Sequence, residues 1–410
     1  MTIRPRRFCL VTTFYPPFNF GGDGITVRRL AHALAERGHH VEVVHCVDAY
    51  DLVKPAGTPP VGDYQDHPAI VHHALRSRAG PLSPLVTHLT GRPGLKGGRL
   101  RTIFGGRFDV VHFHNASLIG VGALPDGPAL TLYTMHDHWL VCPMHVLWRF
   151  NREPCPARRC VACTVRAGRP PQVWRHTGIL ADSLARVDAF IAPSRFTRDK
   201  HLEQGLRVTA PIVHIPNFSP HPAPPSGEVA PHPVPYFLFA GRLERIKGAH
   251  VLVDLFSRYR GADLLIAGDG HEAPALRAAA MGNPQIHFLG VVASSRLEAL
   301  MRHAVAVLVP SVGYEVFPTT VLEAFAVGTP VIGHRLGPVP EMLEGRGGLT
   351  YGDESELLLA LETLVADPGR RRALGAQAQA TWRAEWTVER HLERYEALIA
   401  DLSSEAVLCG

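Results

Sequence analysis

The chain has 410 residues, of which 46% are hydrophobic and 19% are charged, and its formal net charge is +5. This length and composition are typical of a globular protein of two domains, because a single core seldom grows beyond about 250–300 residues. The weak positive charge, with no basic patch interleaved with aromatic residues, argues against a nucleic-acid-binding protein, and no run approaches the roughly 20 apolar residues that span a bilayer.

The amino-terminal segment, residues 8–47, is typical of a strand, a glycine-rich loop, an amphipathic helix ended by Gly38 and a second strand. Gly21, Gly22 and Gly24 allow the backbone to approach a ligand closely, but their spacing is not the dinucleotide-binding fingerprint. The first residues are basic and then apolar, as in a signal peptide, yet no small-residue cleavage site follows. We therefore interpret them as the first strand and expect the protein in the cytoplasm.

His136 follows a strand expected over residues 129–135, at its carboxyl end, where a histidine can face a bound ligand. Asp137 either orients His136 or caps the turn that follows.

Four cysteines fall in a C-x12-C-x4-C-x2-C pattern directly after this strand: Cys142, Cys155, Cys160 and Cys163. The pattern predicts a tetrahedral structural metal site, with zinc as the default ion and an iron–sulfur cluster as the alternative. Such a site stiffens the loop beside His136 and has no catalytic role. Disulfides fit less well with a reducing compartment, and cysteines that only pack are the other interpretation.

Prolines crowd residues 219–235 and predict a connector between two domains, over residues 1–218 and 236–384. Strand-like and helix-like segments alternate on both sides of the connector, which predicts parallel α/β sheets. The expected strands are 8–13, 41–46, 110–114, 129–135, 189–194 and 212–217 before the connector, and 236–240, 263–268, 286–290, 304–309 and 330–333 after it.

Arg242 and Lys247 leave the first strand-to-helix turn after the connector. Turns at the carboxyl ends of parallel strands are where α/β proteins bind ligands. Two fixed cations there can stabilise the charge that develops on a departing diphosphate, without a metal ion. The general interpretation of such a pair is a solvated basic turn. This chain, however, has only four lysines among 42 basic residues, so a lysine at this position is less likely to occur by chance.

A helix is expected to begin between Glu315 and Glu323, so that Glu315 precedes it and Glu323 lies within it. Pro318 and Thr319 are suited to its first turn, and Gly328 is suited to its end. The two carboxylates are then on the order of 10 Å apart, with free backbone N–H groups between them. A sugar nucleotide carries hydroxyls on its sugar, a diphosphate and hydroxyls on its ribose. The spacing therefore favours a sugar-nucleotide site, with the diphosphate at the helix terminus.

The segment 313–331 resembles the E-x7-E signature of family 4 of the retaining GT-B glycosyltransferases, and Arg242 and Lys247 resemble the diphosphate-binding pair of the same family. The matching residues are Gly313, Tyr314, Glu315, Phe317, Glu323, Ala324, Ala326, Gly328, Pro330 and Val331. The resemblance extends over nearly the whole chain. It implies a GT-B fold, with two Rossmann-like, doubly wound α/β domains facing across a cleft, the acceptor in the first domain, the donor in the second, and a helix over 385–410 that crosses back to the first domain.

The resemblance also implies transfer of a sugar from a nucleotide-diphosphate sugar to an acceptor hydroxyl, with retention of the anomeric configuration. No D-x-D sequence is present to hold a catalytic metal ion, so no cofactor is expected for catalysis. The implied catalytic residues are His136, Arg242, Lys247 and Glu315. The implied donor-binding residues are Gly22 beside the phosphates, Gly290, Val291 and Val292 at the nucleobase, and Arg242, Lys247, Glu315, Val316, Phe317, Pro318, Thr319 and Glu323.

One departure from the family is the sequence HRLGPVPEM, where a Gly-Gly pair is usual, because Pro338 has no N–H to donate. A sugar-nucleotide epimerase and a catalytically silent nucleotide-sugar-binding scaffold are the rival functions. The acceptor is a saccharide, a lipid-linked saccharide or a small molecule. The basic and apolar run 88–110 suggests a peripheral contact with the inner face of the membrane, although solvated surface is the more common fate of such a run, and Gly94, Gly97 and Gly98 weaken any helix there.

Overall fold

The computed structural model describes residues 4–54, 60, 64–224 and 230–408. Its contacts divide the chain into two compact units. Unit 1 comprises residues 1–145, 157–215 and 392–410, and unit 2 comprises residues 146–156 and 216–391.

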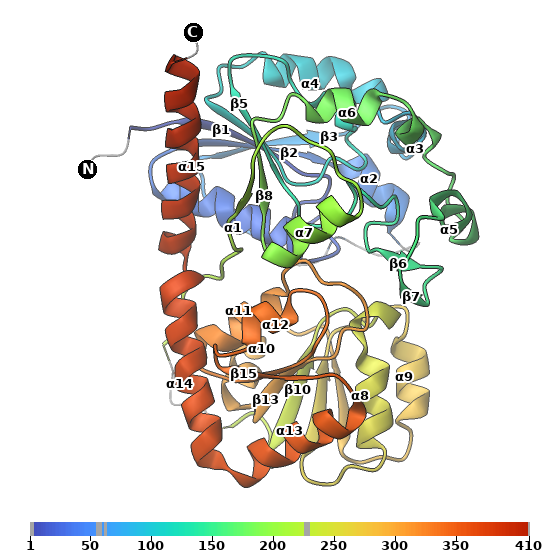
Figure 1. Ribbon diagram of the computed structural model, residues 1–410, viewed down its shortest axis with the longest axis vertical. Helices are drawn as coiled ribbons and strands as arrows, with labels where there is room; N and C mark the ends of the chain where they lie inside the picture. The colour runs from blue at the N-terminus through green and yellow to red at the C-terminus, as the bar shows by residue number, and fades with distance from the viewer. Residues whose placement is uncertain (1–3, 55–59, 61–63, 225–229, 409–410) are drawn as a thin grey trace. The chain divides into compact units, whose positions relative to one another are not determined.

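Unit 1 contains a parallel sheet in the order β3-β2-β1-β4-β5-β8-β9, with helices on both of its faces (Figure 1). The strands are β1 Arg7–Val11, β2 His40–Cys46, β3 Ile70–Leu75, β4 Val110–Phe113, β5 Leu130–Thr134, β8 Ala189–Ala192 and β9 Ile212–His214. The helices are α1 Gly22–Glu36, α2 Val47–Val53, α3 Leu82–Thr90, α4 Gly97–Phe104, α5 Cys160–Arg166, α6 Ile179–Leu184 and α7 Arg195–Glu203, together with most of α15 Val388–Leu408.

Unit 2 contains a second parallel sheet, in the order β12-β11-β10-β13-β14-β15. Its strands are β10 Tyr236–Ala240, β11 Asp263–Ala267, β12 Ile286–Gly290, β13 Ala306–Val309, β14 Val331–His334 and β15 Gly348–Tyr351. Its helices are α8 Ala249–Phe256, α9 Ala273–Ala279, α10 Ser294–His303, α11 Thr319–Ala326, α12 Val339–Leu343, α13 Glu354–Ala366 and α14 Pro368–Glu385. The short hairpin β6 Trp148–Arg149 and β7 Glu153–Pro154 also belongs to this unit.

The core of unit 2 shows why these runs form buried parallel strands. Phe237 and Phe239 of β10 enter one apolar cluster, whereas Tyr236 and Leu238 enter another. Successive side chains of a strand point to opposite faces, so both faces of β10 are covered, as parallel sheets require. The apolar residues of α8, α9 and α13 complete the first cluster, and those of α11, α12 and α14 complete the second.

Each strand expected from the sequence is present, most of them ending earlier than expected. The edge strands β3 and β15 were not expected. In β3 two histidines interrupt the apolar pattern, and β15 begins with a glycine, so neither has the continuous apolar run that identifies a buried strand. Helix α4 forms although three glycines precede or begin it.

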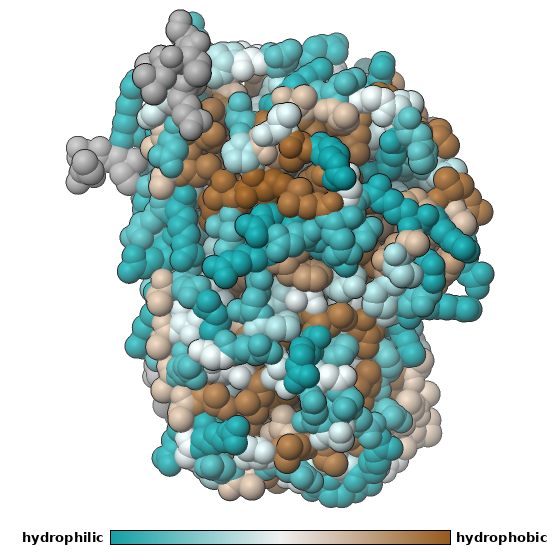
Figure 2. Space-filling view, in the orientation of Figure 1, coloured by the Kyte–Doolittle hydropathy of each residue, from teal (hydrophilic) through white to brown (hydrophobic). Residues whose placement is uncertain are grey.

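The connector has neither helix nor strand in its described residues, 219–224 and 230–235, and residues 225–229 lie outside the described part of the chain. No helix among the described residues is long and apolar enough to cross a membrane. Hydrophilic side chains cover much of the face shown in Figure 2. Lys96, which the sequence places in the basic run, has its ammonium group buried against Ser83 and Thr87, so it is not available to a membrane surface.

Candidate active site

The order of strands in unit 2 reverses between β10 and β13. From β10 the chain moves outward through β11 and β12, and it then returns to β13 on the other side of β10. The carboxyl ends of β10 and β13 are therefore adjacent, at the switch point where α/β sheets bind their ligands. Arg242 and Lys247 follow β10, and Glu315 follows β13, so the fold brings these three predicted residues to one place.

Lys247 and Glu315 form an ion pair at this switch point. The Nζ atom of Lys247 lies 2.7 Å from each carboxylate oxygen of Glu315, and the hydroxyl of Ser311 donates a hydrogen bond of 2.6 Å to Oε1 of the same carboxylate. Burial raises the pKa of Glu315, but the charge and hydrogen bonds of Lys247, the bond from Ser311 and the charge of Arg242 outweigh burial, so the pKa is lowered. Glu315 is therefore a carboxylate at neutral pH.

The loops that carry the pair are joined through their backbones. The N–H groups of Val312 and Gly313 donate to the carbonyl of Ile246. Gly248 adopts a φ of +76°, and a Cβ there would lie 1.9 Å from the carbonyl oxygen of Pro310, so only glycine fits. The turn after β10 and the loop after β13 are thus held in close contact.

Gly313 is also restricted by its surroundings. A Cβ at this position would lie 2.3 Å from Ile246 and 3.0 Å from the indole of Trp148 in the β6–β7 hairpin. The position two residues before Glu315 therefore has no room for a side chain, and Trp148 lies beside the loop of the ion pair.

Helix α11 begins where the sequence predicts. Pro318 is its N-cap residue, Thr319 is its first residue, and Gly328 follows its end with a φ of +78°. The hydroxyl of Thr320 donates to the carbonyl of Ala240 at the end of β10. The helix amino terminus, with its unpaired N–H groups and partial positive charge, therefore lies beside the cationic turn. Val316 and Phe317 belong to the loop that leads into it, and Glu323 lies half-buried within it.

The remaining residues predicted for unit 2 lie at the same edge of the sheet. Gly290 is the last residue of β12 and has a φ of +67°. Val291 is exposed, whereas Val292 packs in part against the core. Pro338 is the N-cap residue of α12, so this helix starts without one of the N–H groups that a glycine would supply.

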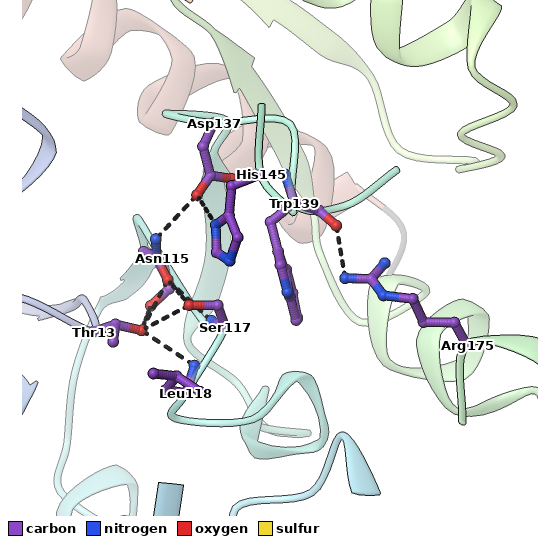
Figure 3. Close-up of polar contacts among 8 residues, drawn as sticks. All are labelled: Thr13, Asn115, Ser117, Leu118, Asp137, Trp139, His145 and Arg175. Carbon is purple, nitrogen blue, oxygen red and sulfur yellow. Dashed lines mark hydrogen bonds and ion pairs between the residues drawn. The ribbon is translucent and has the colours of Figure 1, made fainter. Parts of the chain in front are cut away.

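Unit 1 has its own switch point, between β1 and β4. Thr13 follows β1, and its hydroxyl lies 2.8 Å from the side-chain oxygen of Asn115, which follows β4. That oxygen also accepts from the backbone N–H and the hydroxyl of Ser117. Figure 3 shows how this network continues from Asn115 to Asp137, which follows β5.

Asp137 accepts from three groups, so it holds its loop in one conformation. Its Oδ2 lies 2.7 Å from Nδ1 of His145 and 3.2 Å from Nδ2 of Asn115, and its Oδ1 accepts from the N–H of Trp139. Burial raises the pKa of Asp137, but His145 and the Trp139 N–H outweigh burial and lower it. Of the two roles expected for Asp137, the structure supports the cap of the following turn.

His136 itself contacts a neighbouring histidine. Its Nε2 lies 2.9 Å from Nδ1 of His114, and the two rings are stacked with their centroids 5.2 Å apart. His112, which lies on β4 two residues before His114, has its ring between the hydroxyls of Thr134 and Tyr395. His136 is half-buried at the carboxyl end of β5. Gly22 begins α1, close along the chain to the end of β1, and Asn19 closes the preceding loop through the carbonyl of Gly21.

The prediction of a metal site at the four cysteines is wrong. Among the residues that the structure describes, no three of these cysteines have their sulfur atoms within 4.8 Å of one another. Three separate local structures hold them: Cys142 lies in a turn closed onto His138, Cys155 follows the hairpin, and Cys160 and Cys163 lie in α5. Packing in this region instead uses Arg175, which donates to the carbonyl of Trp139 (Figure 3). Arg175 also donates to the carbonyl of Leu140, and its guanidinium lies 4.7 Å from the centre of the Trp139 ring.

Comparison with known proteins agrees with this arrangement. The chain matches the model of the glycosyl transferases group 1 over residues 234–367 and that of glycosyltransferase family 4 over residues 20–221. The molecule is thus a glycosyltransferase of GT-B fold. More narrowly, the chain belongs to the group 1, family 4 glycosyltransferases.

Individual relatives extend over nearly the whole chain. A glycogen synthase of Mycobacterium tuberculosis is 28% identical over 93% of this chain and 91% of its own length. Sucrose-phosphate synthase from Thermosynechococcus elongatus has a TM-score of 0.74 at 21% identity, over 98% of this chain and 100% of the other. HepE of Anabaena, solved in complex with UDP-glucose, has a TM-score of 0.66 at 16% identity, over 98% of this chain and 100% of HepE. The two solved structures share the fold.

Proposed function

We propose that this glycosyltransferase moves a sugar from a nucleotide-diphosphate sugar to an acceptor hydroxyl, with retention of the anomeric configuration and without a catalytic metal ion. The observation that carries the proposal is the Lys247–Glu315 ion pair, placed with Arg242 and the start of α11 at the switch point of unit 2. The complex of HepE with UDP-glucose supports the same class of donor for this chain.

In this proposal the diphosphate binds between the cations and the start of α11. Arg242 and Lys247 neutralise the charge that grows on the leaving phosphate, and the N–H groups of Phe317, Thr319 and Thr320 add a fixed partial positive charge. These groups are in place before the reaction, so they need no reorganisation in the transition state. Because they supply the stabilisation that a divalent ion gives elsewhere, no metal is required.

Two carboxylates fix the ends of the donor. Glu315 accepts hydrogen bonds from hydroxyls of the transferring sugar, and Glu323 accepts from the ribose hydroxyls. Residues 290–292 border the nucleobase, Gly22 lies beside the phosphates, and His136 contacts the sugar near the reacting carbon. Unit 1 binds the acceptor and unit 2 the donor.

The proposed chemical step needs no protein nucleophile. The acceptor oxygen attacks the anomeric carbon on the face from which the diphosphate leaves. The bond from the acceptor oxygen to carbon forms as the bond from carbon to the phosphate oxygen breaks, and the departing phosphate takes the acceptor proton. Attack on the same face keeps the configuration of the anomeric carbon.

The experiment is an incubation with UDP-, GDP-, ADP- and dTDP-sugars, with and without acceptor extract, in the presence of a chelator. Acceptor-dependent release of nucleotide, with a product of unchanged anomeric configuration by NMR, is expected. Isomerised sugar without release indicates the epimerase instead, and binding with neither reaction indicates the scaffold. Loss of activity in the chelator contradicts metal independence. Residence in the cytoplasm and a membrane contact stay predictions from the sequence.

A further inference from the structure

Among the residues that the structure describes, three carboxylates each lie between two histidines. Glu42 contacts His40 at 2.8 Å and His73 at 2.6 Å. Asp66 contacts His32 at 2.8 Å and His72 at 3.1 Å. Asp263 contacts His232 and His287, both at 2.8 Å. Imidazole and carboxylate are ligands of zinc and similar transition-metal ions, so each set has the chemistry of a metal site.

The first two sets differ from the third because an arginine contacts each of their carboxylates. Arg7 lies 3.3 Å from Glu42, and Arg28 lies 2.6 Å from Asp66. A fixed guanidinium occupies a lone pair of each carboxylate and repels an incoming cation. Within the described part of the chain, neither arginine nor lysine forms an ion pair with Asp263.

The geometry of the third set is also different. At Glu42 and at Asp66, the two histidines contact different oxygens of the carboxylate. At Asp263, in contrast, Nε2 of both His232 and His287 lies 2.8 Å from the same oxygen, Oδ2. The three ligand atoms all lie within 4.8 Å of one another, and among the described residues this is the one group of three or more such ligands that is so compact.

Two of the three ligands come from neighbouring parallel strands. Asp263 is the first residue of β11, and His287, in β12, is opposite Leu265 of β11. Residues 263 and 265 point to the same face of the sheet, so Asp263 and His287 are diagonal neighbours on that face. The strands therefore fix this pair, and His232 approaches it from the described end of the connector.

A metal ion fits this triad with a small outward movement of the side chains. Zinc bonds of about 2.0–2.2 Å in a tetrahedron place neighbouring ligand atoms roughly 3.4 Å apart. The two contacts of 2.8 Å to Oδ2 must therefore open by about half an ångström, and the two imidazole nitrogens, which lie within 4.8 Å of each other, must reach the same spacing, as each imidazole transfers its proton from Nε2 to Nδ1 or to water. The side chains are 14–35% exposed, so an ion can enter and a water molecule can complete the coordination.

We propose that His232, Asp263 and His287 form a binding site for a divalent transition-metal ion, with zinc as the preferred ion. The site lies at the amino ends of β11 and β12, whereas Lys247 and Glu315 lie at the carboxyl end of the sheet. Its role is structural: the ion ties the connector segment before β10 to two strands of unit 2. It is independent of the proposed transfer reaction.

The test uses full-length protein without a polyhistidine tag, stripped of metal by a chelator and titrated with Zn²⁺ by calorimetry. We expect one ion for each chain and a higher melting temperature with zinc. His287→Gln and His232→Gln should each weaken binding by about 100-fold or more, since loss of even an outer partner of a metal ligand costs about 10- to 100-fold. Circular dichroism checks that each variant is folded, and Asp263→Asn gives a third variant if one of them is not.

The other two sets provide matched controls. His73→Gln and His72→Gln remove the corresponding imidazoles at Glu42 and Asp66, and both should leave zinc affinity unchanged. Titration with Co²⁺ identifies the ligands by absorption, because thiolate ligation gives a charge-transfer band that imidazole and carboxylate do not. Absence of zinc binding, equal affinity in His287→Gln and wild type, or a thiolate band at stoichiometric Co²⁺ overturns the proposal.

Discussion

The ammonium group of Lys247 lies 2.7 Å from both carboxylate oxygens of Glu315, although 68 positions separate the two residues in the chain. The side chains are only 27% and 15% exposed, so each charge depends on the other for compensation. A bound diphosphate competes for the same ammonium group. We infer that the pair holds Lys247 in position before the donor arrives and then shares it with the donor.

Replacement of Lys247 by methionine keeps the length of the side chain and removes its charge. We expect kcat/KM to fall by about 100- to 1000-fold, the usual cost of losing one preorganised group that stabilises transition-state charge. Nucleotide release under saturating donor measures the effect. Lys200→Met is the control, because Lys200 pairs with Glu203, an exposed residue of α7 in unit 1, and its activity should equal that of the wild type.

The variant Glu315→Gln, combined with Lys247→Met, tests whether the two side chains act together or independently. If Lys247 and Glu315 act as one unit, the double variant Lys247→Met/Glu315→Gln should be hardly less active than either single variant. Effects that multiply would mean that the two side chains act independently and would contradict a shared role.

Glu323 is placed to bind the ribose of the donor, so its replacement should affect binding more than turnover. Glu323→Gln loses a charge-assisted hydrogen bond of about 1.5–3 kcal/mol, which corresponds to roughly a 10- to 100-fold higher Kd for the nucleotide. Calorimetry with the free nucleoside diphosphate measures this, and the 2′,3′-dideoxy analogue, which lacks both ribose hydroxyls, should bind both proteins equally. Glu298→Gln, on α10 beside Arg302, should bind like the wild type. A Glu323→Gln variant with wild-type affinity for the ribonucleotide would remove the proposed contact.

The sequence predicted the helix and the turn that carry these residues of unit 2 well, because their signals are local. Helix α11 lies where Pro318 and Gly328 indicate, and the turn after β10 carries Arg242 and Lys247 as expected. What the sequence could not predict is that Lys247 contacts Glu315 rather than solvent. That contact follows from the adjacency of β10 and β13, which is a property of the sheet topology.

Long-range networks account for most of what was missed or wrong. Thr13 and Asn115 are 102 positions apart and share no motif, so no pattern links them. The four cysteines show the opposite error. Their spacing matches a metal knuckle, but spacing alone does not determine whether a chain folds back on itself, and among the described residues no three of these thiols come together.

His136 and Asp137 provide the corresponding test in unit 1. His136→Ala should lower kcat by roughly 10- to 100-fold, as expected for one lost polar contact to the sugar, while the Kd for the free nucleotide stays unchanged. Asp137→Asn weakens the hydrogen bond to His145 and should give a smaller loss of kcat by loosening the loop. His303→Ala, at an exposed position on α10, controls for the loss of an imidazole. A changed nucleotide affinity in His136→Ala would place this residue at the phosphates instead.

The next residue along, His138, should make the protein sensitive to acid. Its side chain is buried, and neither ring nitrogen has a hydrogen-bond partner among the described residues. Burial lowers its pKa to about 3, with the nearby His201 and Lys200 adding to the effect and Asp137 opposing it. In the unfolded chain the pKa returns to about 6.5. Between these two values the unfolded state binds more protons than the folded state, so stability decreases as the pH falls through this window.

One proton taken up on unfolding gives a slope of about 1.4 kcal/mol for each pH unit. Other buried histidines, such as His45, add to the slope of the wild type, so the difference between variants is what counts. Urea unfolding of His138→Leu between pH 4 and pH 6 should show a slope smaller by close to one proton, whatever the stability of the variant at pH 7. His271→Leu removes an imidazole that is 89% exposed and should keep the wild-type slope. Equal slopes in His138→Leu and wild type would mean that His138 becomes protonated without unfolding, through an opening of the loop that also carries His136.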